Sequence, residues 1–188
     1  MSIRLVLLDR DGVINEEKDG YVRCPKDLAM IPGSVEAIKI LNKANLLSVI
    51  VTNQGAIGRE IIDIEALNKI HDKLNRTLER SGASVNEIIF CPDHPDRPTR
   101  FRKPGPGMLL QAMDQYKVLP EETVMIGDSL RDLIAANKAQ CRKILVKTGF
   151  GSQTLKEGIP NSLNPFDIKE NLLDAVNSLV GKREADYN

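Results

Sequence analysis

The chain has 188 residues, 41% hydrophobic and 28% charged, which is enough for one domain with a sizeable core. Lysine and arginine number 26, as do aspartate and glutamate, so the charge balance argues against nucleic acid or an anionic membrane as a partner. No apolar stretch approaches the length of a bilayer span, and the N-terminus lacks the pattern of a signal peptide.

The cysteines Cys24, Cys91 and Cys141 are odd in number and widely spaced. This pattern is unlike a disulfide framework and is typical of a reducing compartment. We therefore expect free thiols and a cytoplasmic protein. We also expect a monomer, with one domain over residues 1–181 and a polar tail over 182–188.

The apolar run over residues 5–8 predicts a buried strand of a parallel sheet. Asp9 and Asp11 follow it directly, just before Gly12, where the backbone can turn without a steric penalty. Ligands of parallel sheets sit outside the carboxyl ends of the strands. Two close carboxylates repel each other unless a cation neutralises them, and Mg²⁺ suits oxygen ligands. A solvated turn is the alternative for this pair alone.

Hydrophobic periodicity predicts the remaining elements of the chain. Strands are expected over 46–51, 85–91, 123–128 and 143–146, and helices over 34–46, 63–81, 108–116 and 172–179. The stretches 13–32 and 151–168 are expected to be irregular, and His71 is expected at the surface of its helix. Short strands that alternate with helices predict an α/β fold, a doubly wound parallel sheet with helices on both faces.

Polar residues follow the predicted strands, and we expect them to converge at one edge of the sheet. Phosphoryl transfer needs a nucleophile, positioning and charge neutralisation. Asp9 is expected to attack phosphorus, and Asp11 to exchange a proton with the leaving group and then with water. We expect Thr52 to hydrogen-bond the phosphoryl oxygens, Lys103 to balance their charge and Asp128 to complete the carboxylates around the metal.

Four short motifs occur in a fixed order along the chain: Asp9-x-Asp11-Gly12, Val51-Thr52-Asn53, Lys103-Pro104 and Gly127-Asp128-Ser129-x-x-Asp132. In content and order they resemble the motifs of the haloacid dehalogenase-like phosphatases, and they span most of the chain. The resemblance implies a Mg²⁺-dependent phosphomonoester hydrolase with an aspartyl-phosphate intermediate. It makes Asp9 the nucleophile and Asp11 the general acid/base. It places Mg²⁺ on the Asp9 carboxylate, the Asp11 backbone carbonyl and Asp128, with Asp132 holding a water or a neighbouring ligand.

Further matches are Gly20-Tyr21-Val22, Gln54, Arg59, Cys91-Pro92 and the run from Arg102 to Met108. With them the chain resembles the branch of this family that removes the 7-phosphate of heptose 1,7-bisphosphate. This implies a small phosphorylated sugar as substrate, contacted by Asp19, Tyr21, Asn53, Gln54, Arg59 and Arg102. Arginine is suited to bidentate contact with a distal phosphate. Histidinol phosphate or another small phosphate ester stays an alternative, and a scaffold domain without turnover ranks last, since Asp11 and Lys103 are both present.

The chain departs from that branch in one loop, which usually binds structural zinc through Cys-x-His and then Cys-x-Cys. Cys91 remains here, but His94 is shifted by one position, and Thr99 and Phe101 replace the later cysteines. Structural zinc needs four ligands, so we expect none, with prolines stiffening the loop instead. Core elements fill the sequence between the motifs. We therefore expect a capless domain whose rim is formed by the loops 13–32, 53–62 and 91–103.

Overall fold

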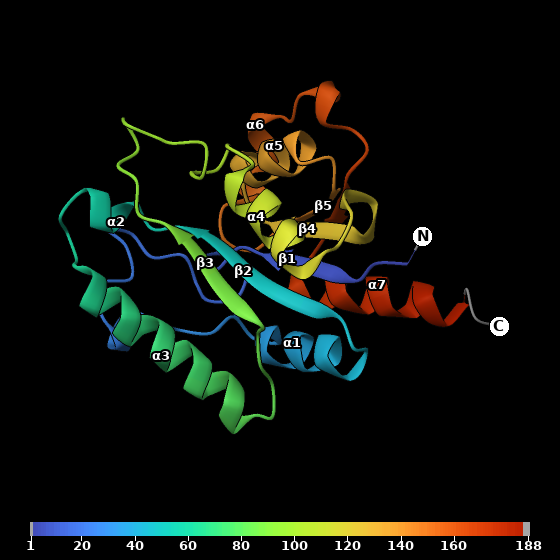
Figure 1. The fold of residues 1–188 in the computed structure, drawn as a ribbon, viewed down its shortest axis with the longest axis horizontal. Helices are drawn as coiled ribbons and strands as arrows, with labels where there is room; N and C mark the ends of the chain where they lie inside the picture. Colours follow the sequence, from blue (N-terminus) through green and yellow to red (C-terminus); the bar gives the residue numbers. More distant parts are fainter. Residues whose placement is uncertain (1, 186–188) are drawn as a thin grey trace.

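A computed structural model describes the backbone of residues 2–185 and the side chains of residues 2–181. In this part of the chain six parallel strands form one sheet, in the order β3-β2-β1-β4-β5-β6 (Figure 1). The strand order changes direction between β1 and β4, and in open parallel sheets ligands bind at such a point. The predicted doubly wound α/β fold is confirmed. The strands are β1 (Leu5–Leu8), β2 (Leu47–Asn53), β3 (Glu87–Cys91), β4 (Thr123–Gly127), β5 (Arg142–Val146) and β6 (Asp167–Lys169).

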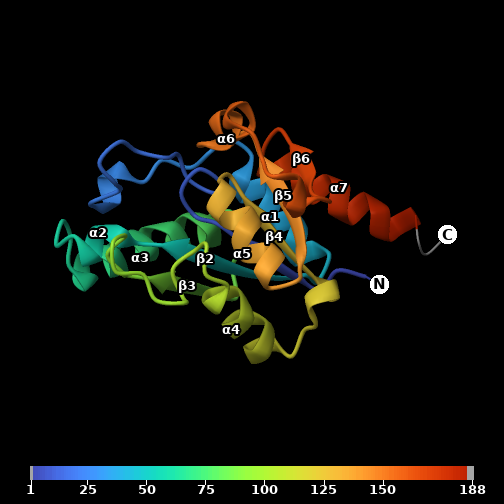
Figure 2. The ribbon, with the colours of Figure 1, turned by 90° about the horizontal axis from the view of Figure 1, so that it is seen from above.

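Helices cover both faces of the sheet (Figures 1 and 2). One face carries α1 (Ser34–Lys43), α3 (Ile64–Arg80) and α7 (Leu172–Ala185). The other carries α4 (Gly107–Tyr116), α5 (Leu130–Lys138) and α6 (Gly151–Glu157). The shorter elements are α2 (Gly55–Gly58), η1 (Pro25–Asp27), η2 (Pro120–Glu122) and η3 (Asn161–Leu163).

Strand β1 shows how the sequence pattern produces these layers. Leu5 and Leu7 belong to the core beneath α4 and α5, whereas Val6 and Leu8 belong to the core beneath α1, α3 and α7. All four side chains are fully buried, because successive residues of a strand point to opposite faces and both faces are covered. The first polar side chain after this strand is Asp9, at the edge where the site forms.

No cap domain is inserted within residues 2–185. The chain between β1 and β2 forms a loop, η1 and α1, and the chain between β2 and β3 forms α2 and α3. The edge of the sheet is therefore bordered by loops and the short helix α2 rather than by a cap domain, and the domain is capless as the sequence predicts. Among the described helices, none has both the length and the apolar content to cross a bilayer.

The expectation of an irregular stretch over 151–168 is wrong, because α6, η3 and β6 lie within it. The edge strand β6 has the sequence Asp-Ile-Lys, which is too short to show an alternating pattern. At the C-terminus, α7 continues to Ala185, into the expected polar tail, and residues 186–188 lie outside the described part of the chain.

The expectation for His71 is also wrong: its side chain is only 8% exposed. His71 follows Leu67 by four residues and precedes Leu74 by three, and this spacing places all three on one face of α3. That face packs against the sheet. The histidine is therefore an inward-facing polar residue in an otherwise apolar stripe.

Candidate active site

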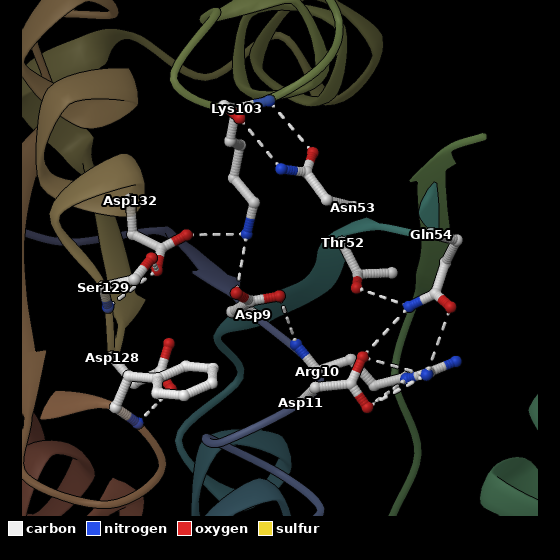
Figure 3. A network of polar contacts seen from close by, with 11 residues as sticks. Asp9, Arg10, Asp11, Thr52, Asn53, Gln54, Lys103, Asp128, Ser129 and Asp132 are labelled. Carbon is white, nitrogen blue, oxygen red and sulfur yellow. Dashed lines mark hydrogen bonds and ion pairs between the residues drawn. The ribbon is translucent and has the colours of Figure 1, made fainter. Parts of the chain in front are cut away.

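A polar pocket of about 280 Å³ opens at the carboxyl ends of the central strands, and Figure 3 shows the network of contacts around it. Asp19 is exposed and is absent from the pocket lining, although the resemblance implied a substrate contact there. The structure brings the other predicted residues together in the lining: Asp9, Asp11, Tyr21, Thr52, Asn53, Gln54, Arg59, Arg102, Lys103 and Asp128.

Lys103 is a buried cation next to Asp9, and only 2% of its side chain is exposed. Its Nζ lies 2.9 Å from Asp9 Oδ2 and 2.6 Å from Asp132 Oδ1. Burial alone lowers the pKa of Lys103, but the Asp132 and Asp9 carboxylates outweigh burial and raise it. Lys103 therefore stays charged next to the expected nucleophile.

Asp132 anchors that lysine. Its Oδ2 accepts hydrogen bonds from the backbone N–H of Ser129 at 3.0 Å and from the Ser129 hydroxyl at 2.6 Å, while its Oδ1 faces Lys103. Burial works against ionisation of Asp132, but Lys103 and Ser129 lower its pKa. Both oxygens of this carboxylate thus have partners within the chain.

The backbone fixes the carboxylate of Asp128. Its Oδ2 accepts a hydrogen bond of 2.8 Å from the N–H of Phe150. A Cβ atom on Gly12 or Gly149 would lie 2.0 or 2.1 Å from that same oxygen, and both glycines have positive φ, +79° and +55°. Only glycine fits at these two positions, so the two turns form a tight cradle that fixes the Asp128 carboxylate.

Asp9, Asp128 and Asp132 each offer an oxygen within 4.8 Å of the others. Burial raises the pKa of Asp9 to about 6, and burial with the Asp132 and Asp9 charges raises that of Asp128 to about 8. Three carboxylates beside the single ammonium of Lys103 leave a negative charge of two, which a divalent cation matches. Carboxylate oxygens suit a hard ion such as Mg²⁺, and Asp9 and Asp128 are the two carboxylates of this cluster that the motif resemblance assigns to the metal.

Asp11 lies on the other side of Asp9 and has a different set of partners (Figure 3). Nη2 of Arg10 lies 2.9 Å from each of its two carboxylate oxygens. Asn15 donates to Oδ1 at 2.8 Å and Gln54 donates to Oδ2 at 3.1 Å. The Gln54 amide also donates to the Thr52 hydroxyl oxygen at 2.9 Å, so the Thr52 proton is left to donate to another acceptor, such as a phosphoryl oxygen.

Asn53 contacts the backbone of Lys103 with its whole amide group. Its Nδ2 donates to the Lys103 carbonyl at 2.9 Å, and its Oδ1 accepts from the Lys103 N–H at 3.0 Å. This pair of bonds fixes the loop that carries Lys103 relative to the end of β2. A positioning role thus stands beside the substrate contact that the sequence predicts for Asn53.

Three arginines line the outer part of the pocket, Arg59, Arg102 and Arg131, and the last two lie close enough to affect each other. Nη1 of Arg102 donates to the Asp93 carbonyl at 3.0 Å, and the side chain lies against Gly55, where a Cβ would be 3.1 Å from Nη1. Burial and then the charge of Arg131 lower the pKa of Arg102. Among the described residues, none of the three arginines forms an ion pair with a carboxylate. The rim is therefore positively charged and available to an anion.

Arg131 is a residue that the sequence analysis missed. The signal was present, because it stands between Ser129 and Asp132 within the fourth motif, at the start of α5. Ser129, Asp132 and Val22 also line the pocket and belong to motifs that the sequence analysis quotes. The members of the lining to which it gave no role are Arg10, Glu17, Gly55, Pro95 and Phe150.

The loop over 91–103 is closed by hydrogen bonds at the positions where the resemblance places zinc ligands. The Asp93 carboxylate accepts from the Thr99 N–H at 2.7 Å, and His94 Nδ1 accepts from the Asp96 N–H at 3.2 Å. Cys91 is buried, which raises the pKa of its thiol to about 11 and disfavours the thiolate that zinc requires. That no structural zinc binds here stays a prediction.

A parallel sheet with this strand order, and with an Asp-x-Asp pair at its switch point facing a buried lysine, defines the class of haloacid dehalogenase-like hydrolases. Residues 100–175 match the HAD-hydrolase-like family model. The chain is 42% identical to the D-glycero-β-D-manno-heptose-1,7-bisphosphate 7-phosphatase of Bordetella bronchiseptica, over 83% of this chain and 87% of that protein. It is 40% identical to the enzyme of that name from Pseudomonas aeruginosa, over 89% and 94% of the two chains.

Among solved structures, the B. bronchiseptica D,D-heptose 1,7-bisphosphate phosphatase complexed with magnesium and phosphate aligns with a TM-score of 0.90. The alignment covers 96% of this chain and 99% of that one, at 39% identity. The chain therefore belongs to the heptose-1,7-bisphosphate 7-phosphatase family of HAD-like phosphatases, and the resemblance noted in the sequence is confirmed.

Proposed function

We propose that this protein uses Mg²⁺ to hydrolyse the 7-phosphate of D-glycero-β-D-manno-heptose 1,7-bisphosphate. The observation that carries the proposal is the match to the B. bronchiseptica enzyme over nearly its whole length, with a TM-score of 0.90. Curated relatives with 39–42% identity carry the β-anomer in their names, which favours that anomer here.

In the proposed reaction the Asp9 carboxylate acts as the nucleophile. An oxygen of Asp9 attacks phosphorus, the bond between phosphorus and the C7 oxygen breaks, and Asp11, which enters this step protonated, gives its proton to the departing alkoxide. Asp11 then takes a proton from a water molecule, which attacks the aspartyl-phosphate and releases inorganic phosphate and free Asp9. The two steps return both aspartates to their starting states.

The remaining residues stabilise the charge that passes through the phosphoryl group. Lys103 lies 2.9 Å from the Asp9 carboxylate, where its ammonium faces the oxygens that gain charge. Thr52 donates its hydroxyl proton to a phosphoryl oxygen. Bound Mg²⁺, held by Asp9 and Asp128 with the Asp11 carbonyl, supplies charge neutralisation between the nucleophile and the phosphate.

The positive rim fits the second phosphate of the proposed substrate. A sugar bisphosphate with one phosphate at Asp9 extends outward, toward Arg102 and Arg131, neither of which forms an ion pair within 4 Å of a carboxylate among the described residues. Guanidinium groups bind phosphate through paired N–H donors, so either arginine can make a bidentate contact. Tyr21 and Arg59, which also line the pocket, are the proposed contacts of the sugar hydroxyls.

We further propose that the monomer is the active form in the cytoplasm, with a small phosphorylated sugar rather than nucleic acid as its partner. Every group of the site described above comes from one chain. All three cysteines are free thiols, as expected in a reducing compartment. The balanced net charge gives no general attraction for nucleic acid.

The proposal is tested by kcat/KM with Mg²⁺ over a small panel of phosphate esters. The panel contains both anomers of heptose 1,7-bisphosphate, histidinol phosphate, fructose 1,6-bisphosphate and a 3′-phosphorylated oligonucleotide. We expect the β-anomer of heptose 1,7-bisphosphate to give the highest kcat/KM. We also expect phosphorus NMR of the product to show the phosphate retained at C1. A preference for histidinol phosphate, or equal rates for all five, would refute the sugar while leaving the phosphatase chemistry intact.

A further inference from the structure

Arg10, which stands between the two aspartates of the first motif, is buried with 1% of its surface exposed. Besides the two 2.9 Å contacts from Nη2, its Nε donates to Asp11 Oδ1 at 3.2 Å. Nη2 also donates to Gln54 Oε1 at 3.3 Å. A buried guanidinium that is paired this fully is oriented toward Asp11 and leaves almost no surface for a substrate.

The remaining nitrogen of Arg10 is bound by His71. Arg10 Nη1 lies 3.2 Å from His71 Nε2, and arginine can only donate, so His71 accepts with its proton on Nδ1. The edge of the Phe90 ring orients the imidazole, with ring centroids 5.8 Å apart and planes at 61°. Burial and then Arg10 lower the pKa of His71 to about 4, which keeps the ring neutral and able to accept.

We propose that Arg10 and His71 are positioning residues that hold the Asp11 carboxylate in place for its proton transfers. This inference rests on the proposed function, in which Asp11 is the general acid/base. A general acid/base acts only within hydrogen-bond reach of its proton, so its orientation limits the rate. The flexible Arg10 side chain is fixed at its far end by a histidine on α3, a 17-residue helix packed on the sheet.

The arrangement makes a specific kinetic prediction. Neither Arg10 nor His71 is expected to touch substrate, so loss of their contact lowers kcat and leaves KM nearly unchanged. The essential feature of His71 is one hydrogen-bond acceptor. Glutamine keeps an acceptor in place of the imidazole, whereas leucine keeps an apolar side chain without one.

The experiment compares His71→Leu with His71→Gln, and uses Asp72→Asn on the exposed face of the same helix as the matched control. We expect His71→Leu to lower kcat by about ten- to a hundredfold, the range for loss of a hydrogen bond to a charged group, with KM changed by less than about twofold. His71→Gln is expected to recover kcat to within about threefold of the wild type, and Asp72→Asn to match the wild type. Arg10→Lys keeps the charge but loses the fork of donors, and is expected to lower kcat at least as much as His71→Leu.

Each variant is assayed on the heptose bisphosphate and on p-nitrophenyl phosphate, with melting temperature as the check on folding. The aryl leaving group needs little protonation, so its kcat reports Asp11 as the base in the second step. A wild-type protein that hydrolyses only the aryl phosphate would refute the proposed sugar and leave this test intact. A folded His71→Leu variant with wild-type kcat, an equal loss in His71→Gln, or an effect on KM alone would overturn the positioning role.

Discussion

The two aspartates of the Asp-x-Asp turn stand two residues apart, yet their surroundings differ. Asp9 shares Lys103 with Asp132 and lies close to Asp128, so negative charge is in excess on its side. Asp11 has Arg10 to itself and accepts further hydrogen bonds from neutral amides. Each motif aspartate thus contacts a different buried cation, and only the carboxylates around Asp9 carry negative charge in excess of that cation.

This difference separates two tasks within one site. Burial and the excess of carboxylates around Asp9 raise the pKa of Asp9 and Asp128, and a divalent cation would relieve this excess of negative charge. The balanced pair at Asp11 needs no metal and instead fixes the direction of one carboxylate. Unlike surroundings for the proposed nucleophile and the proposed proton carrier let two identical side chains play the distinct roles that we propose for them.

The largest expected effect comes from Asp9→Asn. Because an amide cannot form the aspartyl-phosphate, we expect kcat to fall by at least about 10⁴-fold, as in other enzymes that lose their nucleophile. The fold is expected to persist, since Lys103 keeps Asp132 as a partner. Circular dichroism and steady-state kinetics check both parts, with the exposed Asp114→Asn as control. Appreciable turnover by the folded Asp9→Asn protein would refute the nucleophile.

Lys103→Met tests the charge balance on the Asp9 side. In protein free of Mg²⁺, removal of the ammonium leaves the buried Asp132 carboxylate unpaired, and we expect a loss of about 3–5 kcal/mol in the free energy of unfolding. Urea denaturation of the double variant Lys103→Met/Asp132→Leu is expected to recover much of this loss without restoring activity. A single variant as stable as the wild type would show that Lys103 does not compensate these carboxylates.

The pH dependence of stability tests whether His71, which supports Arg10 and Asp11, is neutral in the folded protein. Burial and Arg10 lower the pKa of His71 from 6.5 to about 4, so between these values the unfolded chain binds a proton that the folded protein excludes. Arg10 and Asp11 are the charged groups that act on the imidazole. The contribution of neutral His71 to the free energy of unfolding is full above pH 6.5 and is lost as the pH falls toward 4. Between pH 7 and pH 5 this loss amounts to about 2 kcal/mol.

Urea denaturation at pH 7 and pH 5 measures this contribution. His71→Gln is expected to lose about 2 kcal/mol less than the wild type over this interval. His94→Gln, which removes the other histidine, lies in the loop after β3 and should behave like the wild type. Equal losses in all three proteins would mean that His71 protonates freely and does not serve Arg10 as a neutral acceptor.

The smallest expected effect concerns the rim. Arg131→Gln is expected to raise KM for the heptose 1,7-bisphosphate by about tenfold, the range for one charge-assisted hydrogen bond, and to leave KM for heptose 7-phosphate unchanged. Arg80→Gln, at the end of α3, controls for a general change of surface charge. An equal rise in KM for both substrates would place the Arg131 contact on the sugar or the transferred phosphate.

The same comparison shows what the sequence could predict. The Asp9 side was accessible, because Asp9, Lys103 and Asp128 occupy motif positions and parallel topology brings strand ends together. The contacts that support Asp11 could not be predicted, because the pairing of Arg10 with His71 joins the side chains of residues 61 positions apart. The four- and three-residue spacing of Leu67, His71 and Leu74 did carry a signal that His71 faces inward.

The same contrast between predictable and unpredictable features holds for other parts of the fold. The central strands could be predicted because burial on both faces imposes continuous apolar runs, as in β1. The edge strand β6 could not, because three residues paired on one side need no such pattern. At the rim, Asp19 is absent from the pocket lining although a substrate contact was expected there, and Arg131 belongs to the lining although no role was expected for it. Side-chain direction in loops and first helical turns depends on packing that short motifs do not encode.

The most direct test of the two-sided site is a crystal structure with Mg²⁺ and beryllium fluoride, which mimics the phosphoryl group on a carboxylate. We predict the fluoride adduct on Asp9, the metal on the carboxylates of Asp9 and Asp128, and Asp132 still paired with Lys103. The Asp11 carboxylate should remain in contact with Arg10 and outside the metal sphere except through its backbone. Metal bound by the Asp132 or Asp11 carboxylate, or an adduct on any other residue, would contradict the account.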